Sequence, residues 1–242
     1  IDFDQFIHTH IDSGADVTLL YHSVDNAKEA YLTCNVLNLN RQKGVEAIGP
    51  NHGNKKNQNI YMDTCVMKTE LFISLVREAK KLSSMYTLAD ILNDKCETLD
   101  IRGVAHKGFF ASITDFPSYY AANMDLLDYK AAQELFHENW PIYTRTNDSC
   151  PTQYFDTAEV KNSVISNGCQ IEGTVENSVI GRGCVIKKGA VVRNSVVLAE
   201  VTVGEDVHVE NEVVDKWAKL IHKKEIISPA DQPGYIKRND TL

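Results

Sequence analysis

Histidines and cysteines are among the side chains of this chain that could hold a metal ion or act as a base or nucleophile. His8 and His10 lie two positions apart in a predicted helix, so they point to different faces and we expect surface histidines. The six cysteines stand at positions 34, 65, 96, 150, 169 and 184. They form no Cys-x-x-Cys pair and have no histidine at ligand spacing, which favours reduced thiols over a zinc site or a disulfide frame. The sequence therefore predicts no metal site.

The last third of the chain repeats a four-residue pattern. Asn-Ser-Val-Ile stands at 162–165 and 177–180, and it returns as Asn-Ser-Val-Val at 194–197 and as Asn-Glu-Val-Val at 211–214. Aliphatic residues recur every six positions between these tetrads, which is typical of a left-handed parallel β-helix of hexapeptide repeats. We predict this fold, with a C-terminal extension, over residues 161–242. The first spacing is two residues shorter than the others, which predicts a tightened corner near Gly173–Val175.

Two cysteines and one histidine inside the repeat could carry chemistry. Cys169 and Cys184 hold equivalent places in consecutive coils, so we expect them to stack. His208 is the only histidine within residues 161–214, and hexapeptide acyltransferases use a loop histidine as a general base. Its neighbours Val207 and Val209 place it on a strand instead. Two further points argue against an acyltransferase. Three coils would make only a short β-helix, and the α/β residues before the repeat would have no explanation.

Helices and strands alternate before the repeat. Helices are predicted over residues 3–13, 69–82, 88–93 and 115–136, and strands over 16–21, 30–37, 45–48, 60–67, 99–105 and 109–113. Asp4 can cap the first helix and Gly14 can end it. Thr69 can cap the second helix, and Asp115 with Pro117 in the first turn opens the last. This alternation predicts an α/β domain with a largely parallel sheet.

The predicted domain boundaries follow from these patterns. The α/β domain occupies residues 1–138, and a linker at 139–160, with two prolines and no periodicity, leads into the β-helix at 161–242. The chain begins at Ile1 and enters a helix within a few residues, so we expect an upstream segment that this sequence lacks. Without that segment the sheet would lack strands.

Composition and charge exclude several classes of partner. The chain has 242 residues with 43% hydrophobic and 24% charged, values of an ordinary globular protein. Its net charge of −8 argues against a nucleic-acid or anionic-membrane partner, because both reward basic patches. No apolar run is long enough to span a bilayer and no signal peptide is present, so we expect a cytoplasmic protein.

Three segments resemble the sugar-nucleotide pyrophosphorylases, and the match is nearest to the ADP-glucose pyrophosphorylase (glucose-1-phosphate adenylyltransferase) family. The residues that carry the resemblance are Tyr119-Tyr120-x-x-Asn123-x-Asp125-Leu126, the linker Asn139-Trp140-Pro141-Ile142-Tyr143-Thr144 ahead of the β-helix, and the helix start at 67–75. The resemblance implies an incomplete nucleotidyltransferase (Rossmann-like) domain, without its N-terminal Gly-rich part, followed by the β-helix.

The family's chemistry sets a demand that residues 110–115 do not meet. Glucose 1-phosphate attacks the α-phosphate of ATP and displaces pyrophosphate, which calls for Mg²⁺ held by carboxylates. The family's segment Trp-Arg-Asp-Val-Gly-Thr corresponds here to Phe-Ala-Ser-Ile-Thr-Asp. Ser112 therefore stands in the place of the metal-binding carboxylate and Thr114 in the place of the glycine. A neutral hydroxyl cannot replace an anionic ligand of a hard cation. Asp115 is better explained as the helix cap.

Two further family features are also missing at the corresponding residues. The Glu-Lys-Pro segment, whose lysine binds the sugar phosphate, corresponds to Ile-Gly-Pro, with Gly49 at the lysine position. The Ser-Met-Gly-Ile-Tyr segment, which lines the sugar pocket, corresponds to residues 62–66, beginning with Met62 and Asp63. The resemblance thus implies a degenerate substrate and metal site and no catalytic residue in this chain.

In lacking these groups, the chain resembles the D-type (GlgD) subunits of the family. The resemblance implies a non-catalytic or weakly catalytic regulatory subunit that joins a catalytic ADP-glucose pyrophosphorylase subunit in a heterotetramer. It implies no cofactor bound by this chain, with Mg²⁺ in the catalytic partner. We also expect oligomer contacts through residues 161–214, since unpaired strand edges are generally covered. The alternative is an active glucose-1-phosphate adenylyltransferase, or a related sugar-nucleotide pyrophosphorylase, whose pocket is completed by other residues.

Overall fold

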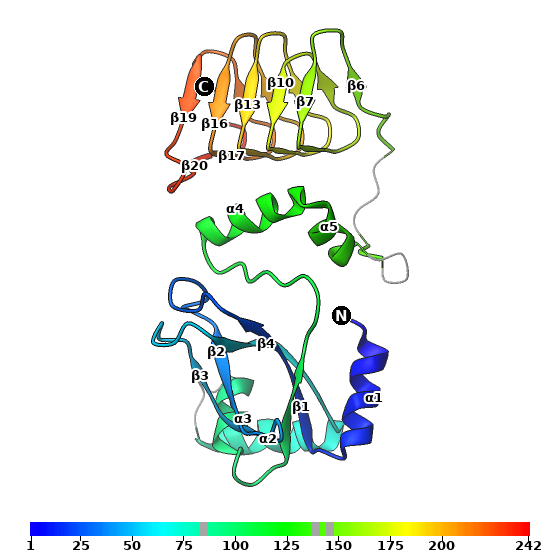
Figure 1. Ribbon diagram of the computed structural model, residues 1–242, viewed down its shortest axis with the longest axis vertical. Helices are drawn as coiled ribbons and strands as arrows, with labels where there is room; N and C mark the ends of the chain where they lie inside the picture. Colours follow the sequence, from blue (N-terminus) through cyan, green and yellow to red (C-terminus); the bar gives the residue numbers. More distant parts are fainter. Residues whose placement is uncertain (83–86, 137–140, 144–147) are drawn as a thin grey trace. The chain divides into compact units, whose positions relative to one another are not determined.

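The computed structural model describes residues 1–82, 87–136, 141–143 and 148–242. Contacts divide the chain into two compact units, residues 1–110 and 111–242, and Figure 1 labels many of their elements. Asn139, Trp140 and Thr144 of the predicted linker motif lie outside the described residues. The domain boundaries drawn from the sequence therefore stay a prediction.

A five-stranded sheet forms the centre of the first unit. Its strands are β1 (Val17–Val24), β2 (Asn35–Leu39), β3 (Val45–Pro50), β4 (Gln58–Met67) and β5 (Ile101–Ala105), in the spatial order β3-β2-β4-β1-β5. Only β1 and β5 run parallel, whereas β2–β3, β2–β4 and β1–β4 are antiparallel pairs. The prediction of a largely parallel sheet is therefore wrong. Short loops without crossover helices join β2, β3 and β4, and such loops can connect only antiparallel strands.

Helices cover both faces of this sheet. They are α1 (Phe3–Ser13), α2 (Thr69–Leu82) and α3 (Leu88–Asp94). Leu75 of α2 and Leu92 of α3 share a buried core with Leu19 of β1. On the opposite face, the His10 Nδ1 atom of α1 lies 2.8 Å from the Thr18 hydroxyl, which alternates with Leu19 along β1. Among the described residues, no helix has the length and apolar character needed to cross a bilayer.

The ends of the first helices differ in detail from the prediction. Asp2, not Asp4, caps α1, because its carboxylate accepts the backbone N–H of Gln5 at 2.9 Å while Asp4 already lies in the first helical turn. Gly14 ends α1 in the left-handed conformation with a φ of 66°, as predicted. Helix α2 begins at Thr69 itself.

Two predicted strands are also corrected. The strand predicted over 30–37 begins only at Asn35, because the preceding residues turn and Tyr31 has a φ of 60°. Residues 109–113 form no strand. The ring of Phe110 there stacks on other rings of the first unit, and the backbone of this segment pairs with no strand.

Two helices open the second unit. Asp115 caps α4 (Phe116–Met124) in a reciprocal capping box with Ser118, and proline stands in the first turn, as predicted. The prediction of one long helix toward Phe136 is wrong. A 3₁₀ turn (Asp125–Leu127) interrupts it, and Asp128 then caps a separate helix, α5 (Tyr129–Leu135), by accepting the Lys130 N–H.

The remaining residues form a parallel β-helix with three faces. One face stacks β18-β15-β12-β9-β6, the second β19-β16-β13-β10-β7, and the third β20-β17-β14-β11-β8. The strands are β6 (Gln153–Tyr154), β7 (Glu159–Lys161), β8 (Val164–Ile165), β9 (Gln170–Ile171), β10 (Thr174–Glu176), β11 (Val179–Ile180), β12 (Val185–Ile186), β13 (Val191–Arg193), β14 (Val196–Val197), β15 (Thr202–Val203), β16 (His208–Glu210), β17 (Glu212–Val214), β18 (Lys219–Leu220), β19 (Glu225–Ile227) and β20 (Gly234–Ile236). Each face stacks five strands, not the three coils predicted. Strands β6 and β7 of the first coil precede the first tetrad, and the last coil has no tetrad, so the repeat did not predict either of them.

The aliphatic repeat supplies the core of the β-helix, as predicted. Its fully buried side chains include Ile171, Val175, Ile180, Ile186, Val192, Val197, Val203, Val209, Val214 and Leu220. The tightened corner is confirmed: only residues 172–173 separate β9 from β10, whereas four residues, 187–190, separate β12 from β13. Cys169 and Cys184, each directly before a paired strand, lie buried one above the other.

The first two residues of each tetrad have separate structural roles. The asparagines at 162, 177, 194 and 211 all have positive φ, between 43° and 56°, so they make a left-handed corner that asparagine tolerates well. The Ser178 hydroxyl donates to the Glu176 carbonyl at 2.7 Å and accepts the Ser195 N–H at 3.1 Å from the next coil. Ser195 repeats this arrangement toward Glu212. A ladder of serine hydroxyls therefore links the coils.

Glu212 occupies the serine position of the fourth coil and is only 4% exposed. Ser228 donates a hydrogen bond to its Oε1 at 2.6 Å, but burial is the larger influence and raises the pKa of this carboxyl. A carboxyl whose pKa is raised in the folded state binds more protons there, so stability falls as pH rises through that pKa. We therefore expect Glu212→Gln to raise the melting temperature at neutral pH and to lose this advantage in acid.

Melting curves of the two proteins from acid to neutral pH test this expectation. Exposed Glu225→Gln serves as the matched control and should change the melting temperature little at any pH. A Glu212→Gln protein that melts below the unmodified chain at neutral pH would contradict the role assigned to burial.

Candidate functional site

An aromatic stack lies at the edge of the first unit's sheet where the parallel strands β1 and β5 both end. His22 belongs to the end of β1, and His106 and Phe110 follow β5. The His22 and Phe110 rings are stacked with centroids 4.8 Å apart and planes at 23°. Tyr31, from the turn before β2, also stacks on Phe110 at 5.8 Å and 27°. The resemblance described above sets Phe110 in the place of the family's tryptophan.

The surroundings of His22 in this stack favour its neutral form. Burial, and next the charge of His106, lower the pKa of His22 below its ordinary value. Its Nδ1 atom is buried and makes no hydrogen bond of good geometry within the described chain. The His106 ring centroid lies 5.8 Å away, and its Nε2 atom is 3.2 Å from the Phe109 carbonyl. His22 therefore adds no positive charge here at neutral pH.

The resemblance predicts a degenerate substrate and metal site at five positions, and three of them lie in the first unit. Gly49 is on β3, and Met62 and Asp63 are on β4. The β1–β4 register shifts at Met62 and Asp63, and exposed Asp63 has a positive φ of 48°. Strand β2 lies between β3 and β4 in the sheet, so Gly49 is not a neighbour of the other two.

Ser112 and Thr114 belong to the second unit, in the segment before α4. The Thr114 N–H donates to the Ser118 hydroxyl at 3.0 Å, and Asp115 accepts the Ser118 N–H at 2.8 Å. Thr114 and Asp115 therefore serve the start of α4, a role that needs no ligand. The five positions fall into two units, and their part in substrate binding stays a prediction.

The other sequence candidates have structural roles. All six cysteines are free. His208 lies on strand β16, as predicted, with its Nε2 atom 3.2 Å from a Glu210 carboxylate oxygen. Among the residues that the structure describes, no three His, Cys, Asp or Glu side chains gather closely enough to hold a metal ion.

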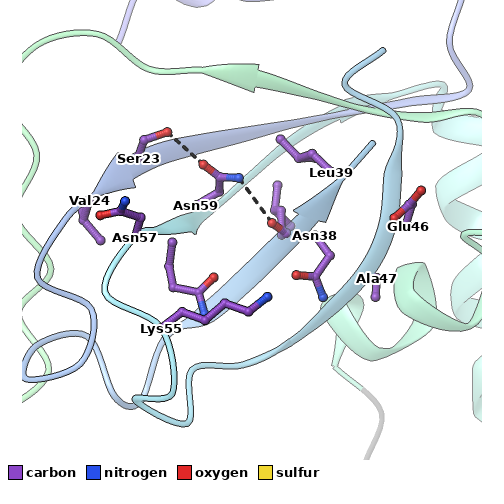
Figure 2. A pocket seen from close by; sticks show the side chains of 11 residues that line it. Ser23, Val24, Asn38, Leu39, Glu46, Ala47, Lys55, Asn57 and Asn59 are labelled. Atoms are coloured by element: carbon purple, nitrogen blue, oxygen red, sulfur yellow. Dashed lines mark hydrogen bonds between the residues drawn. The ribbon is translucent and has the colours of Figure 1, made fainter. Parts of the chain in front are cut away.

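An open groove of about 720 Å³ lies on the first unit and is drawn in Figure 2. Its lining comes from four strands and the loop before β4: Ser23, Val24, Leu37, Asn38, Leu39, Glu46, Ala47, Lys55, Asn57, Gln58 and Asn59. The Ser23 hydroxyl donates to Asn59 Oδ1 at 2.8 Å, and the Asn59 amide donates weakly to the Leu37 carbonyl at 3.5 Å. The Asn38, Asn57 and Gln58 side chains make no hydrogen bond within the described ranges.

Sequence reasoning missed both the stack and the groove. The run of three amides at 57–59 is a signal that could have pointed to the groove. His22 and Tyr31 carry no such signal, because they meet only through the turn before β2 and the path of the backbone after β5.

The chain is similar in sequence to known proteins. A family model described as GlmU-like, C-terminal hexapeptide, matches residues 151–232. The chain is 31% identical to the glycogen biosynthesis protein GlgD of Geobacillus stearothermophilus, over 79% of this chain and 46% of that protein. It is 28% identical to a glucose-1-phosphate adenylyltransferase of Fervidobacterium nodosum, over 88% of this chain and 52% of that protein.

A further relative covers nearly the whole chain. GlgD of Bacillus subtilis is 27% identical over 98% of this chain and 67% of that protein. The chain spans about half the length of the first two of these curated relatives, 46% and 52%.

Proposed function

Because the chain belongs to the ADP-glucose pyrophosphorylase family, we propose that it is a non-catalytic or weakly catalytic regulatory subunit in glycogen biosynthesis. It acts on a catalytic partner that converts ATP and glucose 1-phosphate to ADP-glucose and pyrophosphate. The residue that carries this proposal is Ser112, which the resemblance sets in the place of the family's metal-binding carboxylate.

The chemistry of the remaining residues supports the same conclusion. Transfer of a nucleotidyl group needs Mg²⁺ and cationic side chains to balance the charge of the phosphates. The neutral hydroxyl of Ser112 does not fit a hard cation such as Mg²⁺. His22, whose pKa is lowered by burial, supplies no cation to the aromatic stack at neutral pH.

The relatives themselves favour a second candidate function. One of them is named a glucose-1-phosphate adenylyltransferase and matches 88% of this chain, nearly as much as the GlgD of Bacillus subtilis. An active enzyme would need its carboxylates and lysine from residues other than Ser112 and Gly49. The two functions differ in whether the protein makes ADP-glucose without help.

Pyrophosphate release by the full-length protein alone, with ATP, glucose 1-phosphate and Mg²⁺, tests the proposal. We expect a rate at the background of the assay, measured beside a glucose-1-phosphate adenylyltransferase as the positive control. Turnover in the ordinary range of enzymes, roughly 1 to 1,000 per second, would show that the second candidate is correct.

We further propose that the β-helix provides the contact with other subunits, in a heterotetramer with the catalytic partner or in homo-oligomers. Among the described residues, no strand pairs with the outer edges of β7 and β8 at the first coil, where Val160 and Val164 are 39% and 42% exposed. Open strand edges beside exposed valines favour association. Sedimentation of the full-length protein, alone and with the catalytic partner, tests this. A protein that stays monomeric and does not bind the catalytic partner would contradict the proposal.

A further inference from the structure

The groove of Figure 2 presents hydrogen-bonding groups that make no hydrogen bond with the part of the chain that the structure describes. Asn38 comes from β2, Asn57 from the loop before β4 and Gln58 from the start of β4, so three separate amides line one space. Each amide both donates and accepts hydrogen bonds. Ser23 and Asn59 extend this polar wall through their own hydrogen bond of 2.8 Å.

The charges that line the groove balance each other. Lys55 is the one basic residue of the lining and Glu46 the one acidic residue. An anionic ligand such as a nucleotide or a sugar phosphate would meet no excess of positive charge, and it would meet the Glu46 carboxylate. The lining therefore favours a neutral ligand.

Apolar side chains form the rest of the surface. Ala47 and Val24 line the same space, whereas the Leu37 side chain is only 1% exposed and packs in the core beneath it, with Leu39 partly buried beside that core. A sugar ring offers hydroxyl groups at its rim and C–H groups on its faces, which suits a wall that is partly amide and partly aliphatic. The volume of about 720 Å³ lies within the usual range of ligand sites.

We propose that this groove binds a neutral glycan chain, specifically an α-glucan. Amide groups can pair with adjacent hydroxyls, which also donate and accept, and an open groove lets a polymer enter and leave without its end being enclosed. The choice of an α-glucan among neutral glycans rests on the proposed role in glycogen biosynthesis. The groove would hold the subunit at the polymer that the pathway extends.

Affinity electrophoresis of the chain in native gels that contain glycogen tests this proposal, with maltoheptaose titrations to give dissociation constants. We expect glycogen to retard the chain, and the double variant Asn38→Ala/Asn57→Ala to weaken maltoheptaose binding by about tenfold or more. Gln42→Ala, an exposed amide outside the lining, is the matched control and should bind like the unmodified chain. Circular dichroism melting curves establish that each variant is folded.

Several results would overturn the proposal. They are no retardation by glycogen, equal binding by the double variant and the control, equal retardation by a β-linked glucan, or displacement of maltoheptaose by ATP. None of these measurements depends on ADP-glucose synthesis, so failure of glycan binding and failure of the regulatory role are distinguishable.

Discussion

Replacement of Gly173 by alanine is expected to destabilise the β-helix by about 2 kcal/mol, the cost of overpacking a close contact. Gly173 lies in the tightened corner between β9 and β10. A Cβ atom there would press on the backbone carbonyl oxygen of Ala190 and lie 2.7 Å from that of Lys187. Both atoms belong to the next coil, whose strands are fixed by pairing on both sides, so the backbone cannot yield locally.

Urea denaturation followed by circular dichroism measures this effect. Gly49→Ala is the matched control, because a Cβ atom at Gly49 meets nothing within 4 Å. The control should change the free energy of unfolding far less than Gly173→Ala. Equal effects of the two substitutions would mean that the corner is not tight.

Removal of the Ser178 hydroxyl is the second large effect, and we expect Ser178→Ala to cost about 1–3 kcal/mol of unfolding free energy. Ser178 and Ser195 are both fully buried. The Ser195 N–H donates to the Ser178 hydroxyl at 3.1 Å, and alanine would leave this N–H without a partner and away from water. The Glu176 carbonyl loses less, because it also accepts the Asn194 N–H at 3.1 Å.

Ser166→Ala is the control for the serine ladder. Ser166 lies in the same β-helix, and its hydroxyl makes no hydrogen bond within the part of the chain that the structure describes. Chemical denaturation of both variants should shift the midpoint for Ser178→Ala and leave it nearly unchanged for Ser166→Ala. A smaller loss of unfolding free energy for Ser178→Ala than for the control would contradict the role of the serine hydroxyls in linking the coils.

The two substitutions concern the part of the fold that the sequence predicts best. Each coil of a β-helix depends mainly on its neighbours, so a pattern read over one repeat determines burial, corner and register together. The tetrad residues Asn177 and Ser178 show why, since one forms the corner and the other links adjacent coils. The last coil was missed because residues 219–236 contain no tetrad.

The first unit could be predicted only in part, for a physical reason. Alternation of apolar residues indicates a strand but not the direction in which it pairs, so β2, β3 and β4 were assigned to a parallel sheet. The interruption of the long helix at Asp125–Leu127 depends on local capping by Asp128, which competes with continuation of the helix.

The candidate sites show the same limit. Ser112 and Gly49 were assigned from the resemblance, and the structure places them in different units. The stack of His22, Phe110 and Tyr31 joins residues that lie far apart in the sequence, as does the amide groove. Such tertiary contacts leave no period in the sequence, so only the structure could bring them together.

The most direct test of the central claim is ADP-glucose synthesis by a catalytic subunit from the same cell, measured with and without the full-length protein and with and without sugar-phosphate effectors. A regulatory subunit should be inactive alone and should change the partner's rate or its response to effectors. A partner whose rate and effector response stay unchanged at saturating amounts of the full-length protein would contradict the claim.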